Sequence, residues 1–159
     1  MNIRINPETS NTFESLRTGK DTFRYIICKL EENEVVAVRA VNQTELGTAN
    51  DYNDNSKSAW EHFVANLKSL TQSFKECRYA AFRFQFMSNR GGAELSKMDK
   101  ILFINLCPDD APAKMRKIYT SNAKAVQEAL GGNSVLALQV TDESELEHGA
   151  ILSTLVSRL

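Results

Sequence analysis

The sequence predicts an α/β (α+β) fold in which a mixed sheet lies between layers of helices. Runs of aromatic and β-branched residues, which favour strands, alternate with runs whose apolar residues recur at helical spacing. Polar stretches with Gly, Pro or Asn separate these runs, and no repeats are visible. Because 159 residues is an ordinary size for one domain, we expect a single domain over 1–159.

The start of the chain should form a helix followed by a hairpin. Asn6-Pro7 offers an N-cap and a proline at the first helical position, which predicts a helix over 7–18 that ends before Gly19. The runs 22–30 (TFRYIICKL) and 35–42 (VVAVRAVN) have the composition of strands. The polar residues between them can turn the chain, so the two runs predict a β-hairpin.

A second helix and two more strands should follow a polar loop over 47–55. A helix is expected over 56–73, because apolar residues recur there at helical spacing. They are Trp60, Phe63, Val64, Leu67 and Leu70. The alternation in 78–87 (RYAAFRFQFM) indicates a strand, and 101–107 (ILFINLC) is typical of a buried one. Residues 89–96, with two adjacent glycines, should join these strands.

The last third should contain a long helix, a strand and a terminal helix. The segment 108–112 (PDDAP) supplies acidic capping residues and a proline for the first turn of a helix that runs to Leu130, before two glycines. Residues 135–140 are typical of a strand, and Ser144-x-x-Glu147 is a capping box that should open the terminal helix. The whole order is helix, two strands, helix, two strands, long helix, strand, helix.

Composition excludes several classes of function. Nineteen Lys and Arg against twenty Asp and Glu leave a net charge of -1, so no global field attracts nucleic acid or an anionic membrane. No stretch of about 18 apolar residues occurs, and residues 1–10 lack an apolar signal segment. We therefore expect a cytoplasmic protein that is not an integral membrane protein and has no nucleic-acid partner.

No set of residues points to catalysis or to a metal. Cys28, Cys77 and Cys107 are widely spaced in runs typical of strands, so free buried thiols in a reducing compartment are expected. They show no C-x-x-C spacing, and His62 and His148 no H-x-x-x-H spacing, that would hold zinc. The glycine pairs lack the rest of a phosphate-binding loop, and no G-x-S-x-G elbow is present. We expect no enzyme, cofactor or metal; a catalytic site assembled only by the fold remains the alternative.

The long helix divides into two faces of different chemistry. The residues expected to pack on the sheet are Pro112, Met115, Tyr119, Val126 and Leu130. The opposite side is a mostly basic ribbon that consists of Lys114, Lys117, Ser121, Lys124 and Glu128, with Ile118 and Ala125 beside it. A solvated amphipathic face would have this pattern. Small and apolar residues among lysines also suit a helix that lies in an acidic-rimmed groove of a partner.

At this helix the sequence resembles a known family. The segment 107–122 (CPDDAPAKMRKIYTSN) is similar to the long helix of the actin-depolymerising factor and cofilin family, whose pattern is roughly P-D-x-A-P-x-[KR]-x-[KR]-M-x-Y-A-S-S. Further matches in the correct order are Tyr25-Ile26-Ile27, Cys77-Arg78-Tyr79-Ala80 and Lys97-Met98-Asp99-Lys100-Ile101. The resemblance covers the whole chain and implies a five-stranded mixed sheet in the actin-depolymerising-factor homology (gelsolin-like) fold. The loop before Trp60 and the stretch 96–100 resemble nematode-type invertebrate members most.

The resemblance implies a surface that binds actin monomers and also the sides of filaments. Carried over by position, the expected monomer contacts are Asn2, Ile3, Lys114, Arg116, Ser121, Asn122 and Asp142. Four further residues of the helix complete this expected monomer surface: Met115, Lys117, Ile118 and Lys124. Tyr119 also matches a family position, but the helical spacing places it in the core. Phosphoinositides are a further candidate ligand, and the chain is expected to be a monomer.

Some positions depart from the family. Lys117 replaces the usual methionine, and Met115 stands where a small polar residue is usual. On the surface expected to meet the filament, charged residues are replaced by Met98, Ser153 and Thr154. The basic residues left there are Lys97, Lys100 and Arg158. We therefore expect filament binding and severing to be weaker than monomer binding.

The sequence thus predicts a protein that binds actin monomers and promotes filament depolymerisation and turnover through binding energy alone. The alternative within the same fold is a regulator of the actin branching complex, similar to glia maturation factor. The basic residues Lys114 and Arg116 argue against that alternative, because they match positions that contact actin.

Overall fold

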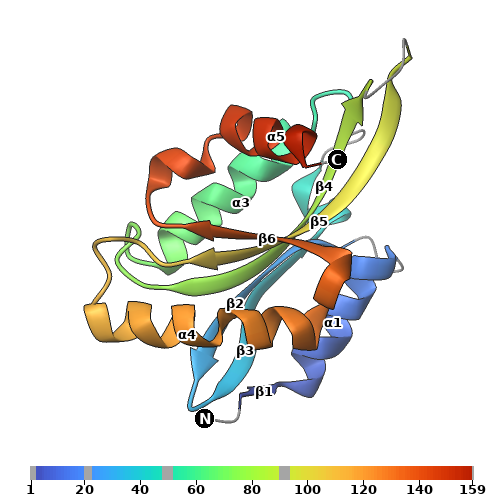
Figure 1. Cartoon of the computed structure of the whole chain (residues 1–159). Helices are drawn as coiled ribbons and strands as arrows, with labels where there is room; N and C mark the ends of the chain where they lie inside the picture. The colour runs from blue at the N-terminus through green and yellow to red at the C-terminus, as the bar shows by residue number, and fades with distance from the viewer. Residues whose placement is uncertain (1–2, 20–22, 48–51, 90–93, 159) are drawn as a thin grey trace.

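The computed structural model describes residues 3–19, 23–47, 52–89 and 94–158. A six-stranded sheet in the order β1-β3-β2-β4-β5-β6 lies between two layers of helices (Figure 1). α1 and α4 cover one face of the sheet, and α3 and α5 cover the other. In chain order the elements are β1 (Arg4–Ile5), α1 (Pro7–Thr18), β2 (Phe23–Glu31), β3 (Glu34–Asn42), α2 (Gln43–Leu46), α3 (Lys57–Leu70), β4 (Arg78–Ser88), β5 (Ser96–Leu106), α4 (Ala113–Leu130), η1 (Gly132–Ser134), β6 (Val135–Val140), η2 (Glu143–Leu146) and α5 (His148–Ser157).

The sheet is mixed because the strands at its two ends run parallel to their neighbours. β1 pairs with β3 and β6 pairs with β5 in parallel, whereas the central pairs are antiparallel. β4 and β5 pair along their whole length, and the far end of this hairpin extends beyond the helices (Figure 1). β5 begins at Ser96, earlier than the expected 101, because its polar first half pairs with the far end of β4.

Strand β4 shows how the sheet supports two cores. Successive side chains of a strand point to opposite faces. Phe82, Phe84 and Phe86 accordingly pack in the cluster under α3 and α5. Tyr79 and Ala81 pack in the cluster under α1 and α4. Both faces of this strand are therefore covered. Its alternate side chains enter two different cores, and not a core on one face and solvent on the other.

Among the described residues the sheet has six strands and not the five expected. The additional strand β1 consists of Arg4 and Ile5, which pair in parallel with Glu34 and Val35 of β3. Ile5 also packs against the cluster under α1 and α4. Two residues are too few to show a period, so no pattern in the sequence indicates this strand.

Helix α3 ends at Leu70, earlier than the expected 73. The Thr71 hydroxyl accepts a hydrogen bond from the Phe74 amide at 3.0 Å and closes a tight turn. Gln72, Ser73 and Phe74 have φ angles of 52°, 62° and 62°. The chain therefore makes a left-handed turn here, and this turn stops the helix without the glycine that usually marks such an end.

The expected helix starts in the last third were wrong in two respects. Pro112 is the N-cap of α4, outside its first turn, and its side chain is exposed instead of packed on the sheet. The capping box consists of Asp142 and Glu145, not of Ser144 and Glu147, and it opens η2 instead of α5. The reason is that the chain makes a separate short helical turn between β6 and α5, and the first capping residue serves that turn.

Candidate protein-interaction surface

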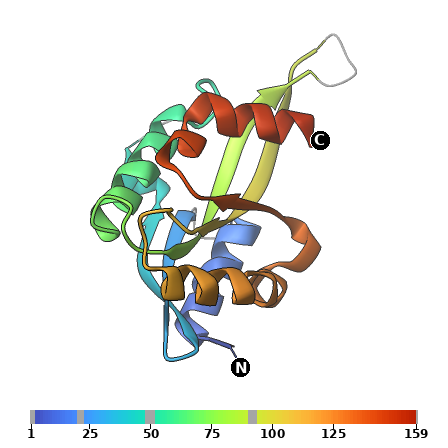
Figure 2. The ribbon, with the colours of Figure 1, turned by 60° about the vertical axis from the view of Figure 1, so that its left-hand side comes forward.

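Helix α4 presents the expected basic ribbon to solvent. Tyr119 and Val126 are buried on its inner side, and Met115 and Leu130 are partly buried in the same cluster. The ribbon residues are all exposed, and they are Lys114, Lys117, Ser121, Lys124 and Glu128. Figure 2 shows α4 at the outside of the molecule, next to α1. The two faces expected for this helix are therefore confirmed, apart from Pro112.

Tyr119 fixes the position of α4 on the sheet. Its hydroxyl accepts a hydrogen bond from the Leu30 amide at 2.9 Å, and its carbonyl accepts one from the Tyr79 hydroxyl at 2.6 Å. Burial raises the pKa of both phenols, so both hydroxyls keep their protons at neutral pH. The inward position expected for Tyr119 is confirmed. These bonds near the middle of the helix hold the ribbon outward.

An apolar pocket of about 490 Å³ lies beside the first turns of α4. Lys114, Met115 and Ile118 line it from the helix, and Lys29 and Leu30 line it from the end of the β2–β3 hairpin. Glu32 and Asn33 of the hairpin turn line it as well. Sequence reasoning missed these four hairpin residues, because their place beside α4 depends on how the hairpin packs against the helix. The expected contact residues on α4 thus surround a concave apolar site with lysines at its rim.

Two of the expected contact residues also hold the start of α4 in place. Arg116 Nε donates to the Ala111 carbonyl at 3.1 Å, and the Arg116 side chain is half-buried. Met115 Sδ accepts a hydrogen bond from the Cys77 amide at 3.2 Å. A change at either residue would therefore alter the helix start as well as the surface.

The remaining expected monomer contacts differ in how free they are. Asn2 lies outside the described residues. Ile3 is partly buried and packs against the cluster under α1 and α4. The Asn122 side chain donates to the Ile118 carbonyl of its own helix at 2.9 Å. Ser121 is exposed on the ribbon.

Asp142 belongs to an acidic patch near the start of α4. It caps η2, and its carboxylate accepts a hydrogen bond from the Ser144 hydroxyl at 3.0 Å. The Asp109 amide donates to the Thr141 carbonyl at 3.0 Å, which joins the segment before α4 to the segment before α5. A pocket of about 330 Å³ there is lined by the acidic patch, which we define as Asp109, Asp110, Asp142 and Glu143. The candidate surface is therefore bipolar, with a basic ribbon and an acidic patch.

The basic residues expected to meet a filament lie on the β4–β5 hairpin and on the end of α5. Lys100 and Arg158 line one small pocket of about 130 Å³, and Arg158 donates to a main-chain carbonyl of β6 at 3.1 Å. The Lys97 ammonium group lies 5.1 Å from the centre of the Tyr52 ring. Met98 is partly buried against the cluster under α3 and α5. A cation at Met98 would therefore point toward the core.

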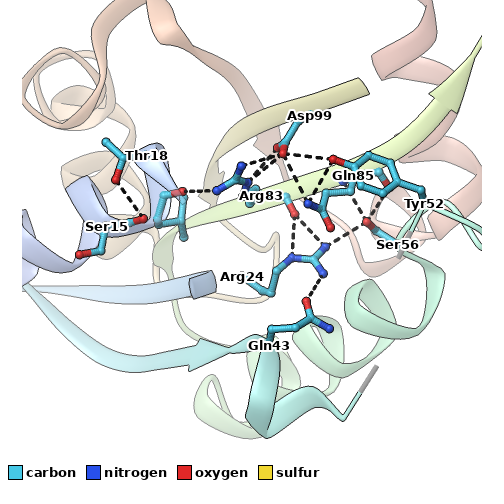
Figure 3. Close-up of polar contacts among 10 residues, drawn as sticks. Ser15, Thr18, Arg24, Gln43, Tyr52, Ser56, Arg83, Gln85 and Asp99 are labelled. Atoms are coloured by element: carbon cyan, nitrogen blue, oxygen red, sulfur yellow. Dashed lines mark hydrogen bonds and ion pairs between the residues drawn. The ribbon is translucent and has the colours of Figure 1, made fainter. Parts of the chain in front are cut away.

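A polar network holds the base of that hairpin (Figure 3). Arg83 and Asp99 form an ion pair, with Nη2 2.8 Å from Oδ2. The buried Arg24 donates to the Gln43 side chain at 2.8 Å and to the Ser56 hydroxyl at 3.0 Å. Burial lowers the pKa of Arg24 to about 10, so the group stays charged at neutral pH. Both guanidinium groups are bonded within the protein, which makes this network a structural one.

In the part of the chain that the structure describes, no three His, Cys, Asp or Glu side chains meet as a metal site would require. Within the same residues, no helix is both long and apolar enough to cross a membrane. The three cysteines are buried free thiols, as expected, although Cys77 and Cys107 lie just beyond the ends of β4 and β5.

Comparison with known proteins identifies relatives over nearly the whole chain. Residues 2–156 match the family described as cofilin/tropomyosin-type actin-binding protein. Actin-depolymerizing factor 1, isoforms a/b, of Caenorhabditis elegans is 43% identical over 152 residues, which cover 95% of this chain and 72% of that protein. Actin-depolymerizing factor 2, isoform c, of the same organism is 31% identical over 156 residues, which cover 98% and 95%. The solution structure of the ADF-like UNC-60A protein of Caenorhabditis elegans has a TM-score of 0.81 and 43% identity, and the match covers 98% of this chain and 95% of that one. The chain therefore belongs to the cofilin/tropomyosin-type actin-binding protein family.

Proposed function

We propose that this chain binds actin monomers through α4 and promotes the depolymerisation and turnover of actin filaments. The observation that carries the proposal is the exposed basic ribbon of α4, which Tyr119 holds outward in a chain of this family. Binding energy is sufficient for such an activity, because a protein that prefers one state of a polymer shifts it toward that state. The chain then acts as a cytoplasmic, monomeric binding protein without catalysis, in one domain over residues 1–159.

The ribbon and the apolar pocket have different tasks in this proposal. Exposed charge pairs contribute only about 0.2–1 kcal/mol each, so the lysines alone would bind weakly. Burial of one apolar side chain contributes about 1.5–3 kcal/mol. We expect an apolar side chain of actin to enter the pocket beside Leu30, Met115 and Ile118, while acidic groups of actin face Lys114 and Lys117.

The proposed monomer surface contains the residues expected from the sequence. It comprises Asn2, Ile3, Lys114, Met115, Arg116, Lys117, Ile118, Ser121, Asn122, Lys124 and Asp142. A weaker filament contact involves Lys97, Lys100 and Arg158, and phosphoinositides remain a candidate ligand of the basic ribbon. The glia maturation factor of Caenorhabditis elegans has a TM-score of 0.63 but only 14% identity, a likeness of fold alone, so it does not favour the alternative function.

The test measures the affinity for monomeric actin of two variants, one on the ribbon and one control on the other face of the molecule. Lys114→Ala combined with Lys117→Ala removes two exposed charges of the ribbon, and Lys57→Ala removes an exposed lysine from the first turn of α3 on the other face. Arg116 stays intact, because its bond to the Ala111 carbonyl would confuse a loss of contact with a loss of structure.

We expect the wild-type chain to bind monomeric actin and to speed the loss of filaments. The ribbon variant should bind monomers about two- to 30-fold more weakly, which is about 0.4–2 kcal/mol for two exposed charges. Lys57→Ala should bind as the wild type does. If the wild-type chain fails to bind actin, the proposed function is wrong. If the wild-type chain binds actin and the ribbon variant binds equally well, the function stands and its assignment to this surface is wrong.

A further inference from the structure

Cys77 and Cys107 lie opposite each other at the end of the β4–β5 ladder. Arg78 pairs with Leu106 in this antiparallel ladder, so continuing the register by one residue places Cys77 opposite Cys107. The Cys107 amide donates to the Val140 carbonyl of β6 at 2.8 Å, on the side away from β4. The Cys77 amide donates to Met115 Sδ. Neither amide bonds to the other cysteine, which makes this a non-hydrogen-bonded position, where the Cα atoms lie about 4.5 Å apart and side chains are closest.

The two thiols share one environment. Cys107 Sγ donates to the Asn105 side-chain oxygen at 3.2 Å and lies 3.4 Å from the Thr120 hydroxyl of α4. The neighbouring Cys77 thiol, helped by Thr120 and by the charge of Arg116, lowers the pKa of the Cys107 thiol to about 7 against the effect of burial. The same contact with Cys107, together with burial, raises the pKa of the Cys77 thiol. At neutral pH a fraction of the Cys107 side chains is thus thiolate beside the Cys77 thiol, the arrangement from which disulfides form.

Cys28 provides the contrast within the same molecule. It lies in β2, packs in the same cluster and is also buried. Burial raises the pKa of its thiol to about 12, so it stays protonated and unreactive. Reactivity is therefore expected of one pair and not of the third cysteine.

We propose that Cys77 and Cys107 form a redox modification site, in which a peroxide converts the thiol pair into a reversible intramolecular disulfide. The Cys107 thiolate attacks one peroxide oxygen, so the O–O bond breaks, and hydrogen peroxide with one proton yields Cys107 sulfenic acid and water. The Cys77 sulfur then displaces the hydroxyl group, which leaves as a second water with the Cys77 proton. Two thiols are oxidised and one peroxide is reduced. The expected Cα separation lies within the range of about 4.4–6.8 Å that a disulfide spans.

Access to the pair requires a local opening, because both side chains are at most 2% exposed. The covering element is the first part of α4, through Arg116 and Thr120. The N-cap of this helix is Pro112, whose side chain has no acceptor to cap the first amides. Helix ends without such a cap open more readily than the rest of the fold. We therefore expect oxidation to be slower than that of a free thiol, with its rate set by the opening of this helix start.

The experiment treats the native full-length chain with hydrogen peroxide, alkylates the remaining thiols in denaturant, and maps peptides by mass spectrometry without reduction. We expect two of the three thiols to be lost, a linked peptide pair that contains Cys77 and Cys107, and Cys28 alkylated. Dithiothreitol should restore all three thiols. After oxidation the Cys28→Ser variant should have no free thiol, whereas the Cys107→Ser variant should keep both of its thiols.

The mapping of the wild-type chain decides the question even if a variant fails to fold. A disulfide that contains Cys28, a disulfide between two copies of the chain, or oxidation of a single cysteine to sulfinic acid would overturn the proposal. So would unchanged Cys77 and Cys107 thiols after an exposure long enough to oxidise the same chain fully in denaturant. None of these outcomes depends on actin, so a failure here leaves the proposed function untouched.

Discussion

At the scale of single residues, Gly19 is the position where backbone and side-chain requirements meet. It ends α1 with a φ of 74°, and a β-carbon there would overlap Arg83 Nη1. Asp99 holds the Arg83 guanidinium in place, so it cannot move aside without loss of the ion pair. Gly47 ends α2 with a similar φ of 68°, and no described atom lies within 4 Å of the corresponding β-carbon.

This pair of glycines separates backbone strain from crowding. Gly47→Ala should lower the free energy of unfolding by about 1–2 kcal/mol, the cost of a left-handed conformation for an L-residue. Gly19→Ala should lower it by about 1–3 kcal/mol more, because the added methyl group overpacks the site beside Arg83. Urea denaturation of both variants measures the difference. Equal losses would show that the Arg83 side chain yields without cost.

Ser73 tests the strain in the turn after α3. It is exposed and has a φ of 62°, between two neighbours that also have positive φ angles. Ser73→Gly should raise the free energy of unfolding by about 0.5–1 kcal/mol, because glycine adopts this conformation without steric strain. Ser121→Gly, at an exposed position inside α4, should lower it by about 0.5 kcal/mol through lost helix propensity. Thermal or urea unfolding that moves both variants in the same direction would contradict this account of the turn.

At the scale of elements, the β4–β5 hairpin and the end of α5 should act separately from α4. Lys100→Ala combined with Arg158→Ala removes two basic groups that line one pocket. We expect this variant to bind actin filaments about two- to 30-fold more weakly in co-sedimentation, because two exposed charges contribute about 0.2–1 kcal/mol each, and to bind monomers normally. The variant with Lys114 and Lys117 replaced should instead lose affinity mainly for monomers. If the hairpin variant loses as much affinity for monomers as for filaments, the two surfaces do not act separately.

The elements themselves were largely predictable because their signals are local. The helical period of α4 separates Tyr119 from Lys117 and Lys124 without knowledge of any other element, and the structure confirms that division. The hairpin of β2 and β3 likewise follows from composition within a short stretch. β1 could not be predicted, because two residues carry no period and its pairing with β3 is a tertiary contact.

Features that join distant segments could not be predicted from the sequence, because they too depend on tertiary contacts. The acidic patch brings Asp109 next to Asp142 only because β6 runs parallel to β5 and ends beside it. The contact of Cys77 with Cys107 depends on the exact pairing of β4 with β5. Leu30 reaches the pocket beside α4 only once the hairpin packs against Tyr119. Strand register and packing determine which of these residues become neighbours, and local periodicity predicts neither.

At the scale of the whole molecule, the sheet separates two surfaces that could each receive a partner. One carries α4 with its basic ribbon and the apolar pocket. The other has an open groove of about 920 Å³ between α3 and the segment that leads into α5, lined by Trp60 and His148 among others. Lys68 of α3 and Glu143 of η2, which also line this groove, form an ion pair at 3.7 Å. The central claim is that actin monomers use the first surface and not the groove.

Hydrogen–deuterium exchange of the chain, with and without saturating monomeric actin, tests that claim most directly because it reports on both surfaces at once. We predict slower exchange in the first half of α4 and in residues 141–142, with α3 and the start of α5 unchanged. Binding at α4 should reduce the opening of its uncapped first turn, which is where the largest protection is expected. Protection centred on α3 and residues 146–149, with α4 unchanged, would contradict the assignment of the monomer surface to α4.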